Sequence, residues 1–329
     1  MIIPSVIFDK DKHIKKLAIS AIIGASVIWG ATGFTIKVAI EEIEPILYIF
    51  LRFSAATVLL LPWAIKYAPR GFTLKKWMLL LLVGALAGPV NYGLIVNGYA
   101  NTNISSAAFI MLAAPVIIMI LSSLFLNENI TKKMILGLSM AFTGAMMVVL
   151  GTVGFAIEGV SLLGNALFIA VIIFTAITLV LSKKVLVDID PRFLVWLMAT
   201  MTFLYSLIFI DFQASLPQLF VISPETTLSV LWGIFMTTIL AYYLYYYAIK
   251  NLKASDVGLF RYLDPLVKAS LGFMVLGEPF SPIYIVGGVV VIAGIVIAET
   301  HFRKHGFIDN LMHRKKDKQP EPHYYHSTY

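Results

Sequence analysis

Residues 17–39 read LAISAIIGASVIWGATGFTIKVA, and this apolar run sets the class of fold. Its one charged residue is Lys37, close to the end of the run. An α-helix rises about 1.5 Å per residue, so about 20 apolar residues cross the roughly 30 Å hydrocarbon core of a bilayer. The run follows a lysine-rich segment, residues 10–16. We therefore predict an uncleaved first transmembrane helix rather than a secretory signal peptide.

Apolar runs of similar length recur along the whole chain. Of its 329 residues, 59% are apolar and 13% are charged, whereas a soluble domain holds about 25% charged residues. The connections between the runs are short and leave no room for a soluble domain. We predict an all-α membrane protein with ten transmembrane helices. The spans run over about 17–39, 45–65, 77–97, 104–126, 134–150, 162–182, 192–210, 227–248, 256–276 and 282–299.

The positive charges predict the orientation of the chain, because cytoplasmic loops carry an excess of Lys and Arg. With the N-terminus inside, most of the 25 Lys and Arg residues fall in cytoplasmic segments, and the outer side holds only Lys37. Both termini are thus predicted to be cytoplasmic, in a multi-pass protein of the plasma (inner) membrane. The net charge of +7 follows from this topology, so we predict no nucleic-acid partner.

The two halves of the chain match each other in sequence. Most matching pairs lie 150 residues apart, and two pairs upstream lie 146 apart. Each half holds five predicted spans, and an odd number inserts the second half upside down relative to the first. Inverted repeats of this kind are a transporter architecture, in which two halves rock about a midplane site. The pairs are Ser105/Ser255, Pro115/Pro265, Glu128/Glu278, Thr131/Ser281, Gly137/Gly287 and Gly144/Gly294, with Lys37/Lys183 and Pro45/Pro191 upstream.

The predicted domain organisation follows from the repeat. A cytoplasmic segment at 1–16 precedes five-helix repeats at 17–151 and 162–299. A basic cytoplasmic tail at 301–329 ends the chain and is predicted to be partly disordered. Because this tail combines basic and apolar residues, part of it is predicted to lie on an anionic membrane surface.

An ordered set of short motifs adds to this interpretation. The first two predicted helices contain Ile28-Trp29-Gly30 and Leu51-Arg52-Phe53. In each half a proline precedes an acidic ending, Leu126-Asn127-Glu128 or Leu276-Gly277-Glu278. The set resembles the EamA-type transporters of the drug/metabolite transporter superfamily over most of the chain. The resemblance implies ten helices, cytoplasmic termini and a central cavity, in proteins that export or exchange amino acids, other metabolites and drugs.

The second half departs from the pattern of the first. Phe174-Thr175 stands where the first half has Trp-Gly, and Met198-Ala199 stands where it has Arg-Phe. Which half contributes more to substrate contacts therefore stays open.

Three ionisable residues of the predicted ninth helix form the strongest candidate site. Arg261, Asp264 and Lys268 are spaced three and four apart, which places them on one helical face. Unpaired charge is costly in hydrocarbon, so this face should point to a cavity or to another helix. In one interpretation the cations recognise a substrate carboxylate, and Asp264 recognises an amine or exchanges a proton. In the other, the three neutralise one another and fix the helix. Their net charge of +1 favours anionic or zwitterionic substrates over cationic drugs.

Single residues elsewhere in the spans complete the candidate site. Trp29 lies mid-helix beside a glycine, and Asn91 follows Gly88-Pro89-Val90, where a proline frees backbone carbonyls. Both are candidates for the cavity wall, with helix packing as the alternative. The tyrosines of residues 242–247 are interpreted as an interfacial belt or as packing. Residues predicted to gate the pathway or to support the structure are Arg52, Glu128, Glu278, Pro115 and Pro265.

The sequence argues against most catalytic chemistry. It has no cysteine, and all six histidines lie outside the predicted spans. It lacks HExxH, GxSxG and P-loop motifs, so we predict no enzyme, catalytic residue, cofactor or metal site. Transport must then be facilitative, gradient-coupled or exchange, and coupling to a proton or another ion stays open. The expected partners are a small-molecule substrate and membrane lipid, for a monomer or a homodimer.

We predict a secondary transporter that exports or exchanges small metabolites such as amino acids by alternating access. Three alternatives stay open: a multidrug cation/proton antiporter, a nucleotide-sugar-like exchanger and a channel. Antiporters of the four-helix multidrug kind use a carboxylate on their first helix, which residues 17–39 lack. The repeat and the single charged face favour a closed central site over a pore lined by rings of charge.

Overall fold

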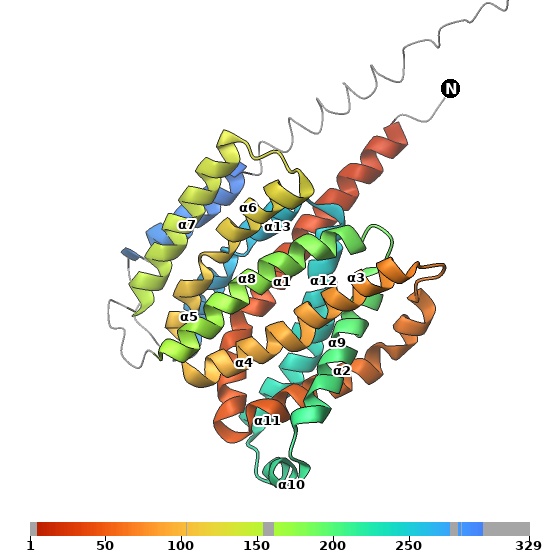
Figure 1. The fold of residues 1–329 in the computed structure, drawn as a ribbon. Coiled ribbons are helices and arrows are strands. Elements are labelled where there is room, and N and C mark those ends of the chain that lie inside the picture. Colours follow the sequence, from red (N-terminus) through yellow and green to blue (C-terminus); the bar gives the residue numbers. More distant parts are fainter. Residues whose placement is uncertain (1–4, 103, 154–160, 277–281, 284, 299–329) are drawn as a thin grey trace, which may run out of the picture.

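The computed structural model describes residues 5–102, 104–153, 161–276, 282–283 and 285–298. Within these ranges the chain forms helices and their connections, without β-strands. The helices run side by side as one bundle (Figure 1). The short helices α10 (Phe212–Ser215) and α11 (Pro224–Trp232) lie at the opposite end of the bundle from the start of α1 (Figure 1).

The helices of the first half follow the predicted spans. The predicted third span is one helical column with a π-helical segment, η1, in its middle. In order, the elements are α1 (Ser5–Glu42), α2 (Pro45–Tyr67), α3 (Leu74–Ala85), η1 (Leu86–Val90), α4 (Asn91–Asn101), α5 (Ile104–Met111), α6 (Ala114–Leu126) and α7 (Lys132–Val153).

The second half repeats this order, with a π-helical segment, η3, in the predicted eighth span. Between its second and third spans it adds α10 and a short 3-10 helix, η2. The elements are α8 (Leu162–Val185), α9 (Pro191–Phe209), α10, η2 (Leu216–Phe220), α11, η3 (Gly233–Ala241), α12 (Tyr242–Asn251), α13 (Ala254–Phe260), α14 (Leu263–Leu276) and a helix over Ile285–Ala298.

Local sequence explains where several helices begin. Pro45 and Pro191 occupy first-turn positions, where the missing backbone N–H of proline has no partner to lose. The Asp190 carboxylate accepts a hydrogen bond from the Arg192 backbone N–H, and Ser223 Oγ accepts one from the Thr226 N–H. These side chains satisfy backbone donors that the first helical turn leaves open.

Eight helical columns of the structure are long and apolar enough to cross a membrane, and they coincide with the first eight predicted spans. Their outer faces carry exposed large apolar side chains, among them Val58, Ile65 and Ile208. An apolar exterior around a packed interior is what a lipid environment requires. The part of the predicted tenth span that the structure describes is a shorter apolar helix over Ile285–Ala298.

The predicted ninth span is not one continuous helix. The α13 helix ends at Phe260 and α14 begins at Leu263, just before Pro265. A proline lacks the N–H that would bond four residues back, and its ring collides with the carbonyl there. The predicted fourth span is interrupted in the same way before Pro115, between α5 and α6. The prolines paired by the sequence repeat thus follow equivalent helix breaks.

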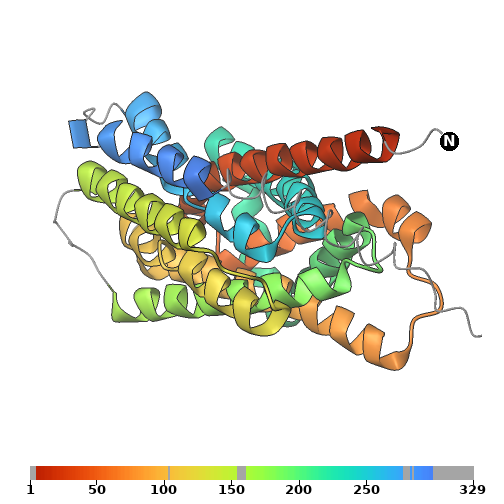
Figure 2. The same ribbon diagram turned by 90° about the horizontal axis from the view of Figure 1, so that it is seen from above.

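The last helices of the two halves touch in a reciprocal way. A Cβ atom added to Gly137 would lie 2.5 Å from the Gly294 carbonyl oxygen, and one added to Gly144 would lie 2.6 Å from that of Gly287. In the sequence repeat, however, Gly137 corresponds to Gly287 and Gly144 to Gly294. Such crossed contacts arise when two equivalent elements meet about a two-fold axis. Both views show α7 beside this last, blue helix (Figure 1, Figure 2).

Candidate functional site

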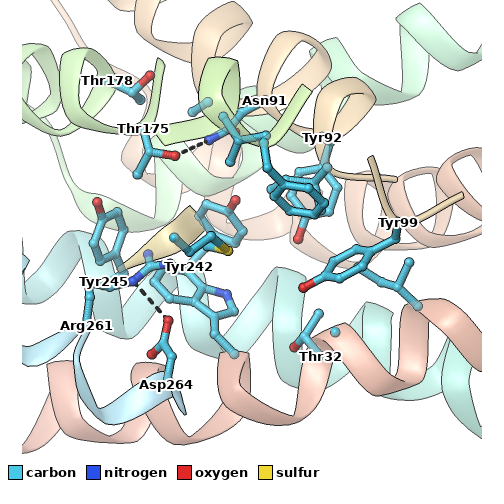
Figure 3. A pocket seen from close by; sticks show the side chains of 18 of the residues that line it. Thr32, Asn91, Tyr92, Tyr99, Thr175, Thr178, Tyr242, Tyr245, Arg261 and Asp264 are labelled. Atoms are coloured by element: carbon cyan, nitrogen blue, oxygen red, sulfur yellow. Dashed lines mark hydrogen bonds and ion pairs between the residues drawn. The ribbon is translucent and has the colours of Figure 1, made fainter. Parts of the chain in front are cut away.

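A central cavity lies between the two halves; its empty space, including the part open to solvent, is about 770 Å³. The halves contribute equally to its lining, from the first, third and fourth spans and from the sixth, eighth and ninth. These spans are equivalent in the repeat, so the cavity lies where the two halves meet. Figure 3 shows its side chains.

The charged side of the cavity is built at the break between α13 and α14. Arg261 Nε donates a hydrogen bond to Asp264 Oδ2 at 3.1 Å, and both side chains are largely buried. Lys268, one turn further along α14, lines the same cavity. The three residues singled out from the sequence therefore face one space, although a helix break, rather than a continuous helix, separates Arg261 from the other two.

Trp29 connects this charged group to the first helix. The Arg261 guanidinium carbon lies 4.5 Å from the centre of the Trp29 ring, within the range of a cation–π contact. The neighbouring Gly30 brings α1 against α14, because a Cβ atom there would lie 2.5 Å from Val267 Cβ. The Trp29-Gly30 sequence thus supplies an aromatic wall and the close helix approach that positions it.

Aromatic side chains form much of the remaining wall. The Trp29 ring centre lies 5.3 Å from that of Tyr242 and 4.9 Å from that of Tyr245. Tyr242, Tyr245 and Tyr246 are buried and line the cavity, so the interpretation as an interfacial belt is wrong for these three. Their spacing of three and four residues marks one helical face and could have indicated this role.

Asn91 supplies a polar group on the opposite side. Its side-chain amide donates to Thr175 Oγ1 at 3.0 Å (Figure 3). Its Oδ1 atom is buried and has no hydrogen-bond partner among the residues described. Asn91 begins α4, directly after the π-helical segment that contains Pro89. Irregular backbone of this kind is tolerated at membrane depth where it borders a cavity.

Sequence reasoning missed the polar residues of the sixth span. Thr175 and Thr178 line the cavity from α8. Threonines inside apolar spans are common and usually bond to their own backbone, so their sequence carries no strong signal. The one hint is that Phe174-Thr175 stands where the first half has Trp29-Gly30.

Arg52 lies behind the cavity wall and is fully buried. Its Nε atom donates to Thr238 Oγ1 at 2.6 Å and its Nη1 atom to the Tyr48 hydroxyl at 3.3 Å. Its Nη2 atom donates to the hydroxyl of Tyr92, whose ring lines the cavity. Thr238 in turn donates to the Gly233 carbonyl five residues back, within the π-helical segment η3. Arg52 thus connects the second span to the third span through Tyr92 and to the eighth span through Thr238. Each of these two spans contains a π-helical segment, and Arg52 itself does not line the cavity.

Glu128 and Lys183 form hydrogen bonds with the chain where α12 ends and α13 begins. The Glu128 carboxylate accepts hydrogen bonds from the backbone N–H groups of Ala254 and Ser255 and from the Ser255 hydroxyl, at 2.6 to 3.0 Å. Lys183 Nζ donates to three backbone carbonyls at 2.6 to 3.1 Å, those of Ile249, Lys250 and Leu252. These contacts satisfy a helix C-terminus and the N-terminus that follows it. Glu278, the repeat partner of Glu128, lies outside the described residues.

Known proteins resemble the chain along most of its length. The sequence profile of the EamA-like transporter family matches residues 16–150 and again residues 162–300. "Uncharacterized transporter YetK" of Bacillus subtilis (strain 168) is 30% identical over 293 residues, which cover 87% of this chain and 86% of that protein. "Probable amino-acid metabolite efflux pump" of Salmonella typhimurium (strain LT2) is 24% identical over 302 residues, covering 84% and 93%. One solved crystal structure has a TM-score of 0.67 at 16% identity, covers 89% of this chain and 99% of its own, and shows the fold alone.

Proposed function

The chain belongs to the EamA-like transporter family, and we propose that it moves a small metabolite across the plasma membrane by alternating access. It is a multi-pass membrane protein and a transporter, not an enzyme. One observation carries the proposed mechanism: a cavity with buried charges lies between two halves that contribute to it equally. A site at the interface of two repeats can face either side in turn as the repeats rock.

The proposed topology has ten transmembrane helices in two inverted halves, with both termini in the cytoplasm. The crossed glycine contacts between α7 and the helix over Ile285–Ala298 support the inversion, because they require these two helices to run antiparallel. The end of the bundle that holds Lys183 and Lys250 would then be cytoplasmic, in line with the excess of positive charge in cytoplasmic loops. The end that holds Glu42 would face outward.

The proposed cargo is an amino acid or a related metabolite, exported or exchanged. Support comes from the Salmonella relative named as a probable amino-acid metabolite efflux pump and from the side chains around the cavity. Arg261 and Lys268 are suited to a carboxylate, and the second Asp264 oxygen has no hydrogen-bond partner in the ranges described. Trp29 and Asn91 would hold the body of the cargo.

Counterflow in proteoliposomes tests the proposal. Vesicles loaded with one unlabelled compound should accumulate the same labelled compound transiently, because a carrier exchanges cargo faster than it returns empty. The panel consists of amino acids and their deaminated acids, a cationic drug and a nucleotide sugar. Saturable counterflow of the first group supports the proposal. Counterflow of the drug or the nucleotide sugar alone would show that this compound, rather than an amino acid or a related metabolite, is the cargo. Unsaturable flux without counterflow would indicate a channel.

A further inference from the structure

The charged side chains around the cavity do not balance. Arg261 and Asp264 form an ion pair, and Lys268 lines the same cavity. Arg52 adds a further cation, and its hydrogen-bond partners are two tyrosines and a threonine, with no carboxylate. An arginine keeps its charge in proteins. Around the cavity, three cations and one carboxylate therefore give a net charge of +2; the buried Asp256, near the start of α13, lines neither this cavity nor the smaller one beside it.

The charge of Arg52 acts on the cavity through a single side chain. The guanidinium carbon lies 4.5 Å from the centre of the Tyr92 ring, which lines the cavity. Charge interactions weaken slowly with distance in a low-dielectric interior. The residue that corresponds to Arg52 in the sequence repeat is Met198, which is buried and neutral. The charge of Arg52 therefore has no charged counterpart at the equivalent position of the second half.

A smaller cavity adjoins the charged group and offers a further donor. Its empty space, including the part open to solvent, is about 330 Å³, and it shares Arg261, Asp264 and Lys268 with the central cavity. Tyr262 also lines it, and the hydroxyl of this buried tyrosine has no hydrogen-bond partner in the described ranges. A buried hydroxyl without a partner is costly, and a ligand oxygen at this point would accept its proton.

From these contacts we propose that the cargo carries a net negative charge, with its carboxylate between Arg261, Lys268 and Tyr262 and an apolar body against Trp29 and Tyr245. A zwitterion would leave the net charge around the cavity at +2, whereas an organic anion lowers that charge. The inference rests on the proposed transport function and narrows it, within metabolites related to amino acids, to acids that lack the ammonium group.

Three compounds with one phenyl body separate the charge states: 3-phenylpropanoate, L-phenylalanine and 2-phenylethylamine. Their affinities for the purified full-length protein should fall in that order. Arg52→Gln should lower the ratio of anion affinity to zwitterion affinity about tenfold, whereas Arg52→Lys should keep it. Tyr262→Phe should lower the affinity for the anion several-fold. The control Lys76→Gln removes a cation from an exposed ion pair and should leave the ratio unchanged.

The ratio of two affinities does not depend on how much of a variant is folded. Equal or tighter binding of phenylalanine would overturn the inference, as would a ratio that Arg52→Gln does not change. Counterflow keeps the two proposals apart. Counterflow of phenylalanine in preference to the acid contradicts the anionic cargo and leaves the carrier standing. Anion binding without counterflow of any compound contradicts the transport function and leaves the anion site standing.

A second inference comes from the repeat and concerns Lys37. Its partner Lys183 holds the carbonyls of Ile249, Lys250 and Leu252 at the end of α12. The equivalent helix end is that of α4, where Asn101 matches Asn251. Both asparagine side chains donate to the carbonyl four residues back at 2.8 Å. The two helix ends therefore share sequence and local geometry.

The two ends differ in their lysine. The Lys37 ammonium makes no hydrogen bond to any residue that the structure describes, whereas Lys183 makes three. We propose that Lys37 binds the backbone carbonyls of Tyr99, Ala100 and Thr102 in the alternate state, when Lys183 has released its own. Each lysine would then latch one end of the bundle, and the structure shows the state with the Lys183 latch made.

The cysteine-free sequence allows a direct test with one added cysteine, Ile95→Cys, on the cavity wall. Its labelling by a membrane-impermeant maleimide in intact cells reports which end is open. Lys37→Met and Lys183→Met should change the labelling rate in opposite directions, each by roughly tenfold for the loss of several charged hydrogen bonds. Lys37→Arg should behave as the unsubstituted lysine. The opposition holds whichever way the bundle is inserted. No effect of Lys37→Met, or an effect of the same sign as Lys183→Met, would overturn the latch.

Discussion

Arg261 and Asp264 compensate each other inside a membrane bundle, so removing one partner leaves the other charge buried alone. Breaking a buried ion pair in this way costs about 3–5 kcal/mol. The pair also lines the cavity, so its loss should weaken cargo binding as well as destabilise the fold.

We predict that Arg261→Gln and Asp264→Asn each reduce transport at least a hundredfold while the protein still inserts in the membrane. Counterflow rates normalised to protein in the vesicles measure this effect. Lys76→Gln is the matched control, because it breaks an ion pair that is exposed rather than buried. Normal turnover by both variants would show that the pair only supports the bundle.

Residue identity in the sequence was enough to find the charged group, because ionisable side chains are rare in apolar spans. Arg261, Asp264, Lys268, Trp29 and Asn91 all line one cavity. The same reasoning could not place Tyr242 and Tyr245, since tyrosine is equally at home at a membrane interface and in a protein interior. Whether Arg52 lines the cavity or lies behind it depends on which helix face packs inward, and neighbouring spans decide that.

At the scale of single elements, α7 packs closely against the helix over Ile285–Ala298 because glycines lie at their contact. At Gly144 an added Cβ atom would lie 2.6 Å from the Gly287 carbonyl oxygen and from the Val291 nitrogen, both backbone atoms that cannot move aside alone. Close approach of this kind is how transmembrane helices gain packing without a hydrophobic driving force.

Gly144→Ala should therefore push α7 away from the helix over Ile285–Ala298 and destabilise the fold by about 1–3 kcal/mol. Gly93→Ala is the control, since its Cβ atom would meet nothing closer than the Tyr205 hydroxyl at 3.5 Å. Alanine favours a helix over glycine by up to about 1 kcal/mol, so Gly93→Ala should be neutral or stabilising. Thermal unfolding of both variants in detergent measures the difference, and equal melting temperatures would contradict it.

The sequence predicted which elements exist but not how two of them are interrupted. Hydropathy over about twenty residues is the same for a continuous helix as for two helices with a break between them. Pro115 and Pro265 were visible, yet many prolines in transmembrane helices only kink them, and neighbouring contacts decide the outcome. The π-helical segments had no sequence signal beyond Pro89 in the first.

At the scale of the whole molecule, each half of the chain packs against the other along the cavity and along its last helix. The contacts across the cavity and between the glycines join the halves through side chains and backbone, and not only through the chain itself.

Two separate chains, residues 1–153 and 161–329, should therefore assemble in the membrane when expressed together. We expect them to copurify and to retain a measurable part of the counterflow rate, because the reciprocal contacts replace the covalent link. Gly144→Ala in the first chain should weaken copurification more than Gly93→Ala. Independent purification of the two chains would show that the link is required.

The crossed contact of Gly137 with Gly294 and of Gly144 with Gly287 indicates how the two halves of the gene arose. A half-length protein that entered the membrane in both orientations could have made this contact with a copy of itself, using one surface twice. Duplication and fusion would then have fixed one copy in each orientation. The two copies have since diverged, and one half has an arginine at position 52 where the other has a methionine at position 198.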